Sequence, residues 1–262
     1  MPCPDSIGRL RQTARFCALA FACLLIASGP AQAQHPYDMV VEMVADQTSD
    51  NLILERCLKA SCFASHAMVD RCHNEKYQGV TYIEQGNILC LNGNIEWGGD
   101  YWSEGDKLKS IKKFHIKKHV HLVVTSYGGE LTNSIMISRY LRKYDYSVIV
   151  SEFCLSACAQ FIFIGSNKRI VSEGGVVAFH GGPFSQDQIQ KLEVSDIEKG
   201  KITKAMSEFY AFYKEMKIPI EITYNFPQSV LEKAKNNKGT MWAPNQEDYK
   251  SYGVDVTFCA NP

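Results

Sequence analysis

The sequence predicts an α/β protein whose core is a largely parallel sheet with helices packed against it. From about residue 86 onward, short strand-like runs alternate with helix-like stretches, which is typical of parallel strands joined by right-handed crossovers. The run His119–Thr125 is largely apolar, which indicates a strand buried on both faces. Glycine pairs follow two strand-like runs, at Gly128-Gly129 and Gly181-Gly182, where tight turns are expected.

The elements before residue 155 follow from apolar spacing and turn residues. The strand at Ile88–Leu91 is closed by the turn pair Asn92-Gly93, and the strand at Tyr146–Ser151 is rich in β-branched residues. Apolar residues near helical spacing predict a helix over Leu131–Tyr144. A further helix is expected over Tyr101–Lys113, where the lysines form a solvated face before the next strand.

The elements after residue 155 begin with a compact apolar helix over Ser156–Ile164 and a short strand at Val176–Phe179. A long helical stretch is expected over Gln188–Lys217, interrupted at Gly200, because glycine weakens a helix interior. A last short helix and a final strand complete the prediction, at Glu247–Tyr252 and Val254–Phe258.

The N-terminus has the pattern of a secretory signal peptide over residues 1–33. Arg9, Arg11 and Arg15 precede the apolar run Phe16–Ile26, which small residues and Ala31-Gln32-Ala33 follow. That run is short for a permanent membrane span. We therefore expect cleavage before Gln34, no membrane span in the mature chain, and a periplasmic or secreted protein.

The charge balance argues against nucleic acid as a partner. The leader takes three of the 28 basic residues and one of the 28 acidic residues, which leaves 25 and 27 in the mature chain. Such a chain lacks the strong basic excess that binds phosphate backbones. We expect no cofactor.

Seven cysteines remain after cleavage of the leader, and most should pair in an oxidising compartment. Their connectivity is open from the sequence. A Cys- and His-bearing extension over residues 34–85 precedes the α/β region, but its spacings match no standard zinc pattern, so disulfides with incidental histidines are the favoured interpretation and no metal site is expected. The seven are Cys57, Cys62, Cys72, Cys90, Cys154, Cys158 and Cys259.

Three short segments, each after a strand-like run, could together form a site for acyl transfer. Ser126-Tyr127-Gly128-Gly129 could supply a backbone amide to an oxyanion, and His180 in the third segment could serve as a general base. Ser156, at the start of a helix, could be the nucleophile, with the Ala157 amide beside it. Each alone has a simpler interpretation, namely a tight turn, a helix N-cap or a turn histidine. Their order and spacing favour a serine hydrolase.

Cys154 and Cys158 flank Ser156, and three interpretations are open. They could form a disulfide that braces the nucleophile turn, or they could be two small buried residues. A redox role ranks last, because a buried thiol without cationic neighbours is poorly activated.

With these segments in view, the chain resembles the proteolytic subunit of the Clp protease, in the exported branch of the ClpP/crotonase superfamily. The likeness covers residues 86–258. Residues 126–129 are similar to the family's S-P-G-G turn, 155–157 to its A-S-M nucleophile segment and 178–180 to its M-I-H segment. Ala243-Pro244 with Tyr252–Asp255 is similar to the family's ending. The resemblance implies a spiral ββα core over residues 86–262, a peptide or protein substrate, and a homo-oligomer.

The resemblance also implies roles for individual residues. Ser156 would be the nucleophile and His180 the base, with the Gly129 and Ala157 amides as the oxyanion hole. The family's acid falls at Lys238, so no carboxylate stands there, and Asn236 or Asn237 is the candidate third member. An exported chain should not depend on the family's cytoplasmic ATPase. The alternative is a catalytically inactive relative that serves as a binding or oligomerisation module.

Overall fold

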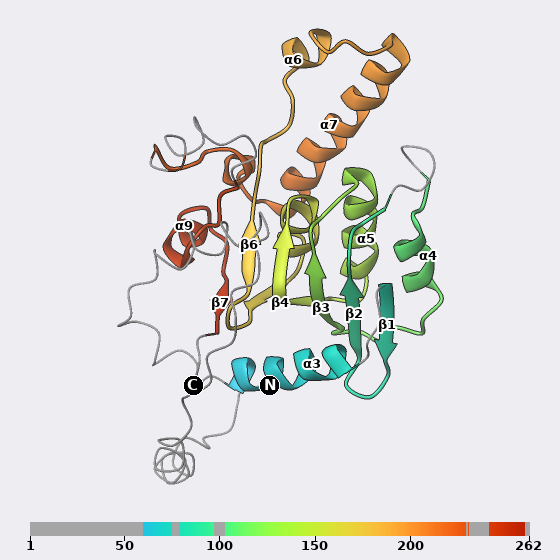
Figure 1. The fold of residues 1–262 in the computed structure, drawn as a ribbon, viewed down its shortest axis with the longest axis vertical. Coiled ribbons are helices and arrows are strands. Elements are labelled where there is room, and N and C mark those ends of the chain that lie inside the picture. Colours follow the sequence, from blue (N-terminus) through green and yellow to red (C-terminus); the bar gives the residue numbers. More distant parts are fainter. Residues whose placement is uncertain (1–59, 75–78, 97–102, 229, 231–240, 260–262) are drawn as a thin grey trace, which may run out of the picture. The chain divides into compact units, whose positions relative to one another are not determined.

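A seven-stranded, mostly parallel sheet flanked by helices forms the centre of the fold (Figure 1). The computed structural model describes residues 60–74, 79–96, 103–228, 230 and 241–259, all within one compact unit that spans Met39–Pro262. The predicted signal peptide, residues 34–59 and the candidates Asn236 and Asn237 lie outside the described residues. The α/β class predicted from the alternating pattern is confirmed.

The strand order is β1-β2-β3-β4-β5-β7, and β6 pairs with β4 off this path. Only β1 is antiparallel to its neighbour; the other pairings are parallel. The strands are β1 (Gly79–Ile83), β2 (Ile88–Asn92), β3 (His121–Ser126), β4 (Ser147–Leu155), β5 (Lys168–Val171), β6 (Val176–Ala178) and β7 (Thr257–Phe258).

Strand β4 changes partner partway along its length. Residues 147–150 pair with β5, and residues 153–155 pair with β6. The register with β3 shifts at the same level, so that Ser126 comes to lie opposite Cys154. This switch brings the ends of β3, β4 and β6 together at one edge of the sheet, directly before the three segments singled out in the sequence.

Helices cover both faces of the sheet. Alternate residues of β3 and β4, such as Leu122 and Val148, face a large core with α5, α7 and the π-helical segment η1, while Val123 and Ile149 face α3. This two-sided burial explains why the β3 run is apolar without alternation. The helical elements are α3 (Ala60–Asn74), α4 (Asp106–Lys112), α5 (Leu131–Arg142), η1 (Cys158–Phe163), α6 (Gln186–Gln190), α7 (Asp196–Met216), the 3₁₀ segment η2 (Ile220–Thr223) and α9 (Gln246–Ser251).

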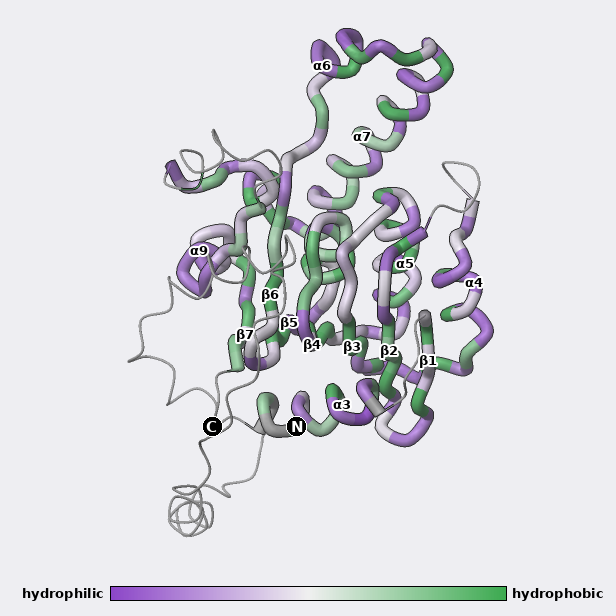
Figure 2. The backbone as a smooth tube through the Cα atoms, in the orientation of Figure 1, coloured by the Kyte–Doolittle hydropathy of each residue, from purple (hydrophilic) through white to green (hydrophobic). Residues whose placement is uncertain are grey.

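The long helical stretch is interrupted before Asp196, so the predicted break at Gly200 is wrong. The Ser195 hydroxyl accepts from the Glu198 amide while the Glu198 carboxylate accepts from the Ser195 amide, a reciprocal cap that starts α7. A second reciprocal cap of this kind, between Ser185 and Gln188, starts α6. Gly200 lies inside α7, where an added Cβ would meet nothing within 4 Å. The amphipathic α7 alternates between hydrophilic and hydrophobic residues along its length (Figure 2).

Several predicted boundaries also shift. The strand predicted over Tyr146–Ser151 continues to Leu155, the helix predicted from Ser156 is a π-helical segment that begins at Cys158, and the last strand is only Thr257–Phe258. The helix expected from Tyr101 begins at Asp106. In the described part of the chain, every helix is too short or too polar to cross a membrane.

Three disulfides join six of the seven cysteines that follow the predicted leader; the seventh, Cys57, lies outside the described residues. Cys62–Cys259 and Cys72–Cys90 fasten α3 to the sheet, at the residue after β7 and at β2 respectively. The third, Cys154–Cys158, closes a short loop at the end of β4. Disulfides persist in oxidising compartments, so the three bonds fit a protein exported from the cytoplasm.

Candidate active site

Ser156 occupies a sharp turn between strand β4 and the segment η1. Its φ is +55°, in the left-handed region that residues with a side chain seldom adopt. Its amide donates to the Ala178 carbonyl at 2.9 Å, and its carbonyl accepts from the Gln160 amide at 2.9 Å. A serine on a tight turn from a strand into a helix, in such a conformation, has the geometry of the elbow on which α/β-hydrolases carry their nucleophile. An ordinary N-cap has extended backbone, so the simple capping interpretation is wrong.

His180 lies directly beside this serine. The distance between Ser156 Oγ and His180 Nε2 is 2.6 Å, within hydrogen-bond range for proton transfer. The histidine follows β6, and Phe179 before it exchanges two backbone hydrogen bonds with Trp242, of 2.7 and 2.8 Å. Gln160 Nε2 donates to the Gly181 carbonyl at 2.9 Å and to the His180 carbonyl at 3.4 Å. The backbone on both sides of the histidine is therefore held.

The environment of His180 favours its neutral form. The residue is exposed at the surface, yet desolvation by the groups around the ring lowers the pKa of His180 from its ordinary value of 6.5. A histidine with a lowered pKa is neutral at physiological pH. The neutral imidazole is the form that can accept the proton of a serine hydroxyl.

Two glycines bring the turn after β3 against the nucleophile turn. Gly128 and Gly129 have φ of +90° and +133°. A Cβ on Gly128 would lie 2.8 Å from the Ala157 nitrogen, and one on Gly129 would lie 2.2 Å from the Ile95 carbonyl oxygen. Neither position has room for a side chain: the backbone at Gly128 lies against Ser156 and Ala157, and that at Gly129 lies against Ile95.

The approach leaves two amides beside the serine. The Gly128 amide donates to the Ser126 hydroxyl at 3.1 Å, but among the described residues neither the Gly129 nor the Ala157 amide has an assigned acceptor. Free N–H groups near a nucleophile can stabilise the oxyanion of a tetrahedral intermediate. The two sequence candidates for the oxyanion hole thus lie on touching turns, with Ala157 directly after Ser156 and Gly129 directly after Gly128, which contacts Ser156.

The third member of the site was predicted at Asn236 or Asn237, which lie outside the described residues. Within the described part of the chain, no group accepts a hydrogen bond from His180 Nδ1. The chain is described again from Met241, and the next residue, Trp242, pairs with Phe179. The third member stays a prediction.

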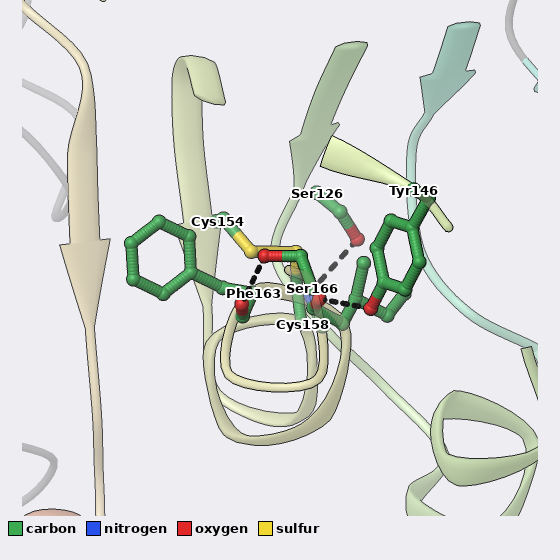
Figure 3. The surroundings of a disulfide bond; sticks show 8 residues. Ser126, Tyr146, Cys154, Cys158, Phe163 and Ser166 are labelled. Atoms are coloured by element: carbon green, nitrogen blue, oxygen red, sulfur yellow. Dashed lines mark hydrogen bonds between the residues drawn. A yellow bond between two sulfur atoms is a disulfide. The ribbon is translucent and has the colours of Figure 1, made fainter. Parts of the chain in front are cut away.

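The Cys154–Cys158 disulfide encloses the base of the nucleophile turn (Figure 3). Both side chains are fully buried, and their Cα atoms are 5.2 Å apart. The prediction of a disulfide that braces this turn is therefore confirmed, and the interpretation of the pair as two small unpaired buried residues is wrong. The buried Tyr146 hydroxyl donates to the Ile162 carbonyl at 2.5 Å and lies 3.0 Å from the Ser138 hydroxyl, so that it anchors η1.

Two residues of the site escaped the sequence analysis, Gln160 and Trp242. A buried glutamine inside the apolar stretch Cys158–Phe163 was the available signal for the first, because buried polar groups need partners. Trp242 gave no such signal.

Two histidines near the start of β3 each have a partner other than a metal site. His121 Nδ1 lies 2.8 Å from the Ser147 hydroxyl and His119 Nδ1 lies 2.7 Å from the Asp145 carboxylate. In the described ranges, no three histidine, cysteine or acidic residues are arranged to hold a metal ion.

Comparison with known proteins adds no family assignment. A scan against protein-family models gave no match, and a search of curated proteins gave no match either. The function is therefore argued from the geometry of the site.

Proposed function

We propose that this chain is an exported serine hydrolase of the ClpP/crotonase superfamily, acting as a peptidase through Ser156 and His180. The observation that carries the proposal is the 2.6 Å contact between Ser156 Oγ and His180 Nε2 at a strained strand-to-helix turn. Two other Ser–His pairs among the described residues lack the elbow. Ser151 Oγ lies 2.8 Å from His73 Nε2 and Ser147 Oγ lies 2.8 Å from His121 Nδ1, but both serines are within strand β4. Distance alone would not separate the three pairs, whereas the sharp turn is found only at Ser156 among these serines.

The reaction would proceed by acyl transfer. Ser156 Oγ attacks the carbonyl carbon of the substrate while His180 Nε2 accepts the hydroxyl proton. The Gly129 and Ala157 amides donate to the resulting oxyanion. When the bond to the leaving group breaks, His180 returns its proton to that group. Water then attacks the acyl-enzyme with the same histidine as base, which regenerates Ser156 and releases the acid.

The finer assignments rest on supporting observations. The switch of β4 from β5 to β6 supports the spiral ββα core that the resemblance implies. The three disulfides support a periplasmic or secreted location. A homo-oligomer follows from the resemblance alone, and light scattering of the purified protein tests it.

Labelling with a fluorophosphonate probe tests the function. The oxidised wild-type protein is expected to gain one label at Ser156, and Ser156→Ala and His180→Ala should abolish it. Ser151→Ala is the matched control and should label as wild type, because Ser151 has a histidine partner but no elbow. A wild-type protein without label at Ser156 would overturn the proposal and leave the inactive binding module as the interpretation.

A further inference from the structure

The disulfide Cys154–Cys158 is placed symmetrically around the nucleophile. Cys154 is two residues before Ser156 and Cys158 two residues after it. In nucleophile elbows of the G-x-S-x-G type, these two positions are glycines, which permit the sharp turn. Here both carry side chains, and a covalent bond joins them instead. The glycines that usually permit this turn are thus absent from both positions, and the two cysteines that replace them are joined by a disulfide.

The serine itself needs such a restraint. Its φ of +55° is unfavourable for a residue with a side chain, and such a conformation persists only where the surroundings enforce it. The two backbone hydrogen bonds of Ser156 connect it to Ala178 in β6 and to Gln160 in η1. The second of these joins the turn to η1 by a single hydrogen bond. Among the described residues, the disulfide is the covalent crosslink between the end of β4 and the start of η1.

The size of the loop argues that this bond acts locally. The three disulfides span sequence separations of 197, 18 and 4 residues, and Cys154–Cys158 is the shortest. The restraint that a crosslink places on the unfolded chain grows with the length of the loop that it closes. This bond therefore contributes least to global stability through chain entropy. Its main effect is on the geometry of the residues that it encloses.

Two free thiols could not occupy the same space. Sulfur atoms in non-bonded contact lie farther apart than bonded ones, and both cysteine side chains are fully buried in a packed core. Reduction would therefore widen the turn. Gly128, whose Cα has no room for even a methyl group against Leu155, Ser156 and Ala157, would have to move with it.

We propose that the Cys154–Cys158 disulfide is the positioning element that holds Ser156 in its reactive conformation, so that the site is assembled only in the oxidised protein. This inference rests on the proposed function. Reduction by a dithiol breaks the S–S bond, places one proton on each cysteine sulfur, and converts the dithiol to its own disulfide. In the reduced chain, Ser156 leaves the left-handed region and Oγ loses its contact with His180 Nε2. In a thiol-reducing compartment, such as the cytoplasm before export, the chain would have Ser156 and His180 but not the contact between them.

The experiment compares two disulfide deletions. The variant Cys154→Ala/Cys158→Ala is expected to lose at least tenfold in kcat and in the rate of fluorophosphonate labelling, with KM changed less than twofold. The variant Cys72→Ala/Cys90→Ala removes a bond between α3 and β2 and should lower Tm while it labels at the wild-type rate. A folded Cys154→Ala/Cys158→Ala variant that labels like wild type would overturn the inference.

Two further measurements keep the test decisive. A crystal structure of Cys154→Ala/Cys158→Ala reports the φ of Ser156 and the distance from its Oγ to His180 Nε2, which needs no activity. An unchanged Ser156 geometry in this variant refutes the positioning role of the disulfide, whether or not the wild type is labelled. Absence of label on the wild type, by itself, refutes only the proposed function. If that variant does not fold, the folded wild type is treated with dithiothreitol, and alkylation identifies the opened bond. Labelling should fall with opening of Cys154–Cys158 and return on reoxidation; labelling that persists with this bond open contradicts the inference.

Discussion

Gly128 packs so closely on Ser156 that a Cβ added to the glycine would lie 2.9 Å from the serine Cβ. The turn after β3 and the turn after β4 are thus in direct contact, and each fixes the position of the other. The serine, the histidine and two backbone amides come from three strand ends that this contact gathers at one edge of the sheet. Changes in the glycine turn should therefore affect the nucleophile.

Gly128→Ala tests this contact. The new Cβ would lie 2.5 Å from the Leu155 carbonyl oxygen, and the φ of +90° is unfavourable for alanine. We expect a loss of roughly a hundredfold in kcat, since a shift of about 1 Å in a catalytic group can have that effect. The control is Gly181→Ala, which has φ +60° but nothing within 4 Å of the added Cβ. Equal kcat values for the two variants would contradict the prediction.

The pH dependence should report on His180. Because the pKa of His180 is lowered from 6.5, its neutral form persists at lower pH than in an ordinary histidine. The acid limb of kcat/KM should therefore fall below pH 6.5, with a plateau above it. The titration of the His180 ring by NMR should give the same midpoint. An acid limb at or above pH 6.5 would show that another group, or a charged histidine, governs the reaction.

The same shift has a consequence for stability. The unfolded chain binds a proton at His180 more readily than the folded chain does, so the contribution of this residue to stability is fully present above pH 6.5. It is lost as the pH falls through the lowered pKa. Urea unfolding across this range gives the free energy of unfolding of wild type and of His180→Gln. The difference between the two proteins should be smaller at acid pH than at neutral pH. Parallel curves would argue against the lowered pKa.

Gln160→Met removes two donors with little change in volume. The Gly181 and His180 carbonyls would lose their side-chain partner, and the histidine would be held less firmly. We expect kcat to fall roughly tenfold to a hundredfold with KM nearly unchanged, because only the position of the base is altered. Steady-state kinetics measures this, with Tm as the control for folding. A loss of Tm alone, with wild-type kcat, would show that Gln160 has only a structural role.

The disulfides should rank in opposite orders for stability and for activity. Loop-closure entropy predicts a stabilisation of about 5 kcal/mol for the 197-residue separation of Cys62–Cys259 and about 2 kcal/mol for the four-residue separation of Cys154–Cys158. Urea unfolding of the alanine double variants should show the larger loss for Cys62–Cys259, whereas kcat should fall more for the other. A single ranking in both measurements would contradict a local role for Cys154–Cys158.

Part of this fold was predictable because its signals are local. The apolar run of β3, the amphipathic α5 and the turn glycines are visible in a short window of sequence, and the three strand-end segments pointed to Ser156 and His180. Strand β5 was missed because Lys168 and Arg169 make up half of it; its pairing with both β4 and β7 stabilises it. Helix α3 was missed because its alanines, serines and cysteines show little periodicity, and two disulfides hold it to the sheet.

The finer geometry of the site depends on distant contacts. The left-handed conformation of Ser156 follows from the Ala178 carbonyl, the disulfide and the glycine turn, which come from separate elements. The pairing of the cysteines likewise depends on which strand ends meet in space. Composition and spacing identified which residues could react, but not what holds them in place.

The bond between Cys62 and Cys259 turns most of the chain into a closed covalent ring, from α3 to the residue after β7. Both Ser156 and His180 lie within this ring. A single cut by a protease, for example in the exposed connection between α6 and α7, would open the ring without releasing either fragment. The nicked protein would migrate as one species on a gel until a reductant is added. Ser156 and His180 would thus stay in one molecule after damage that separates the halves of an uncrosslinked chain.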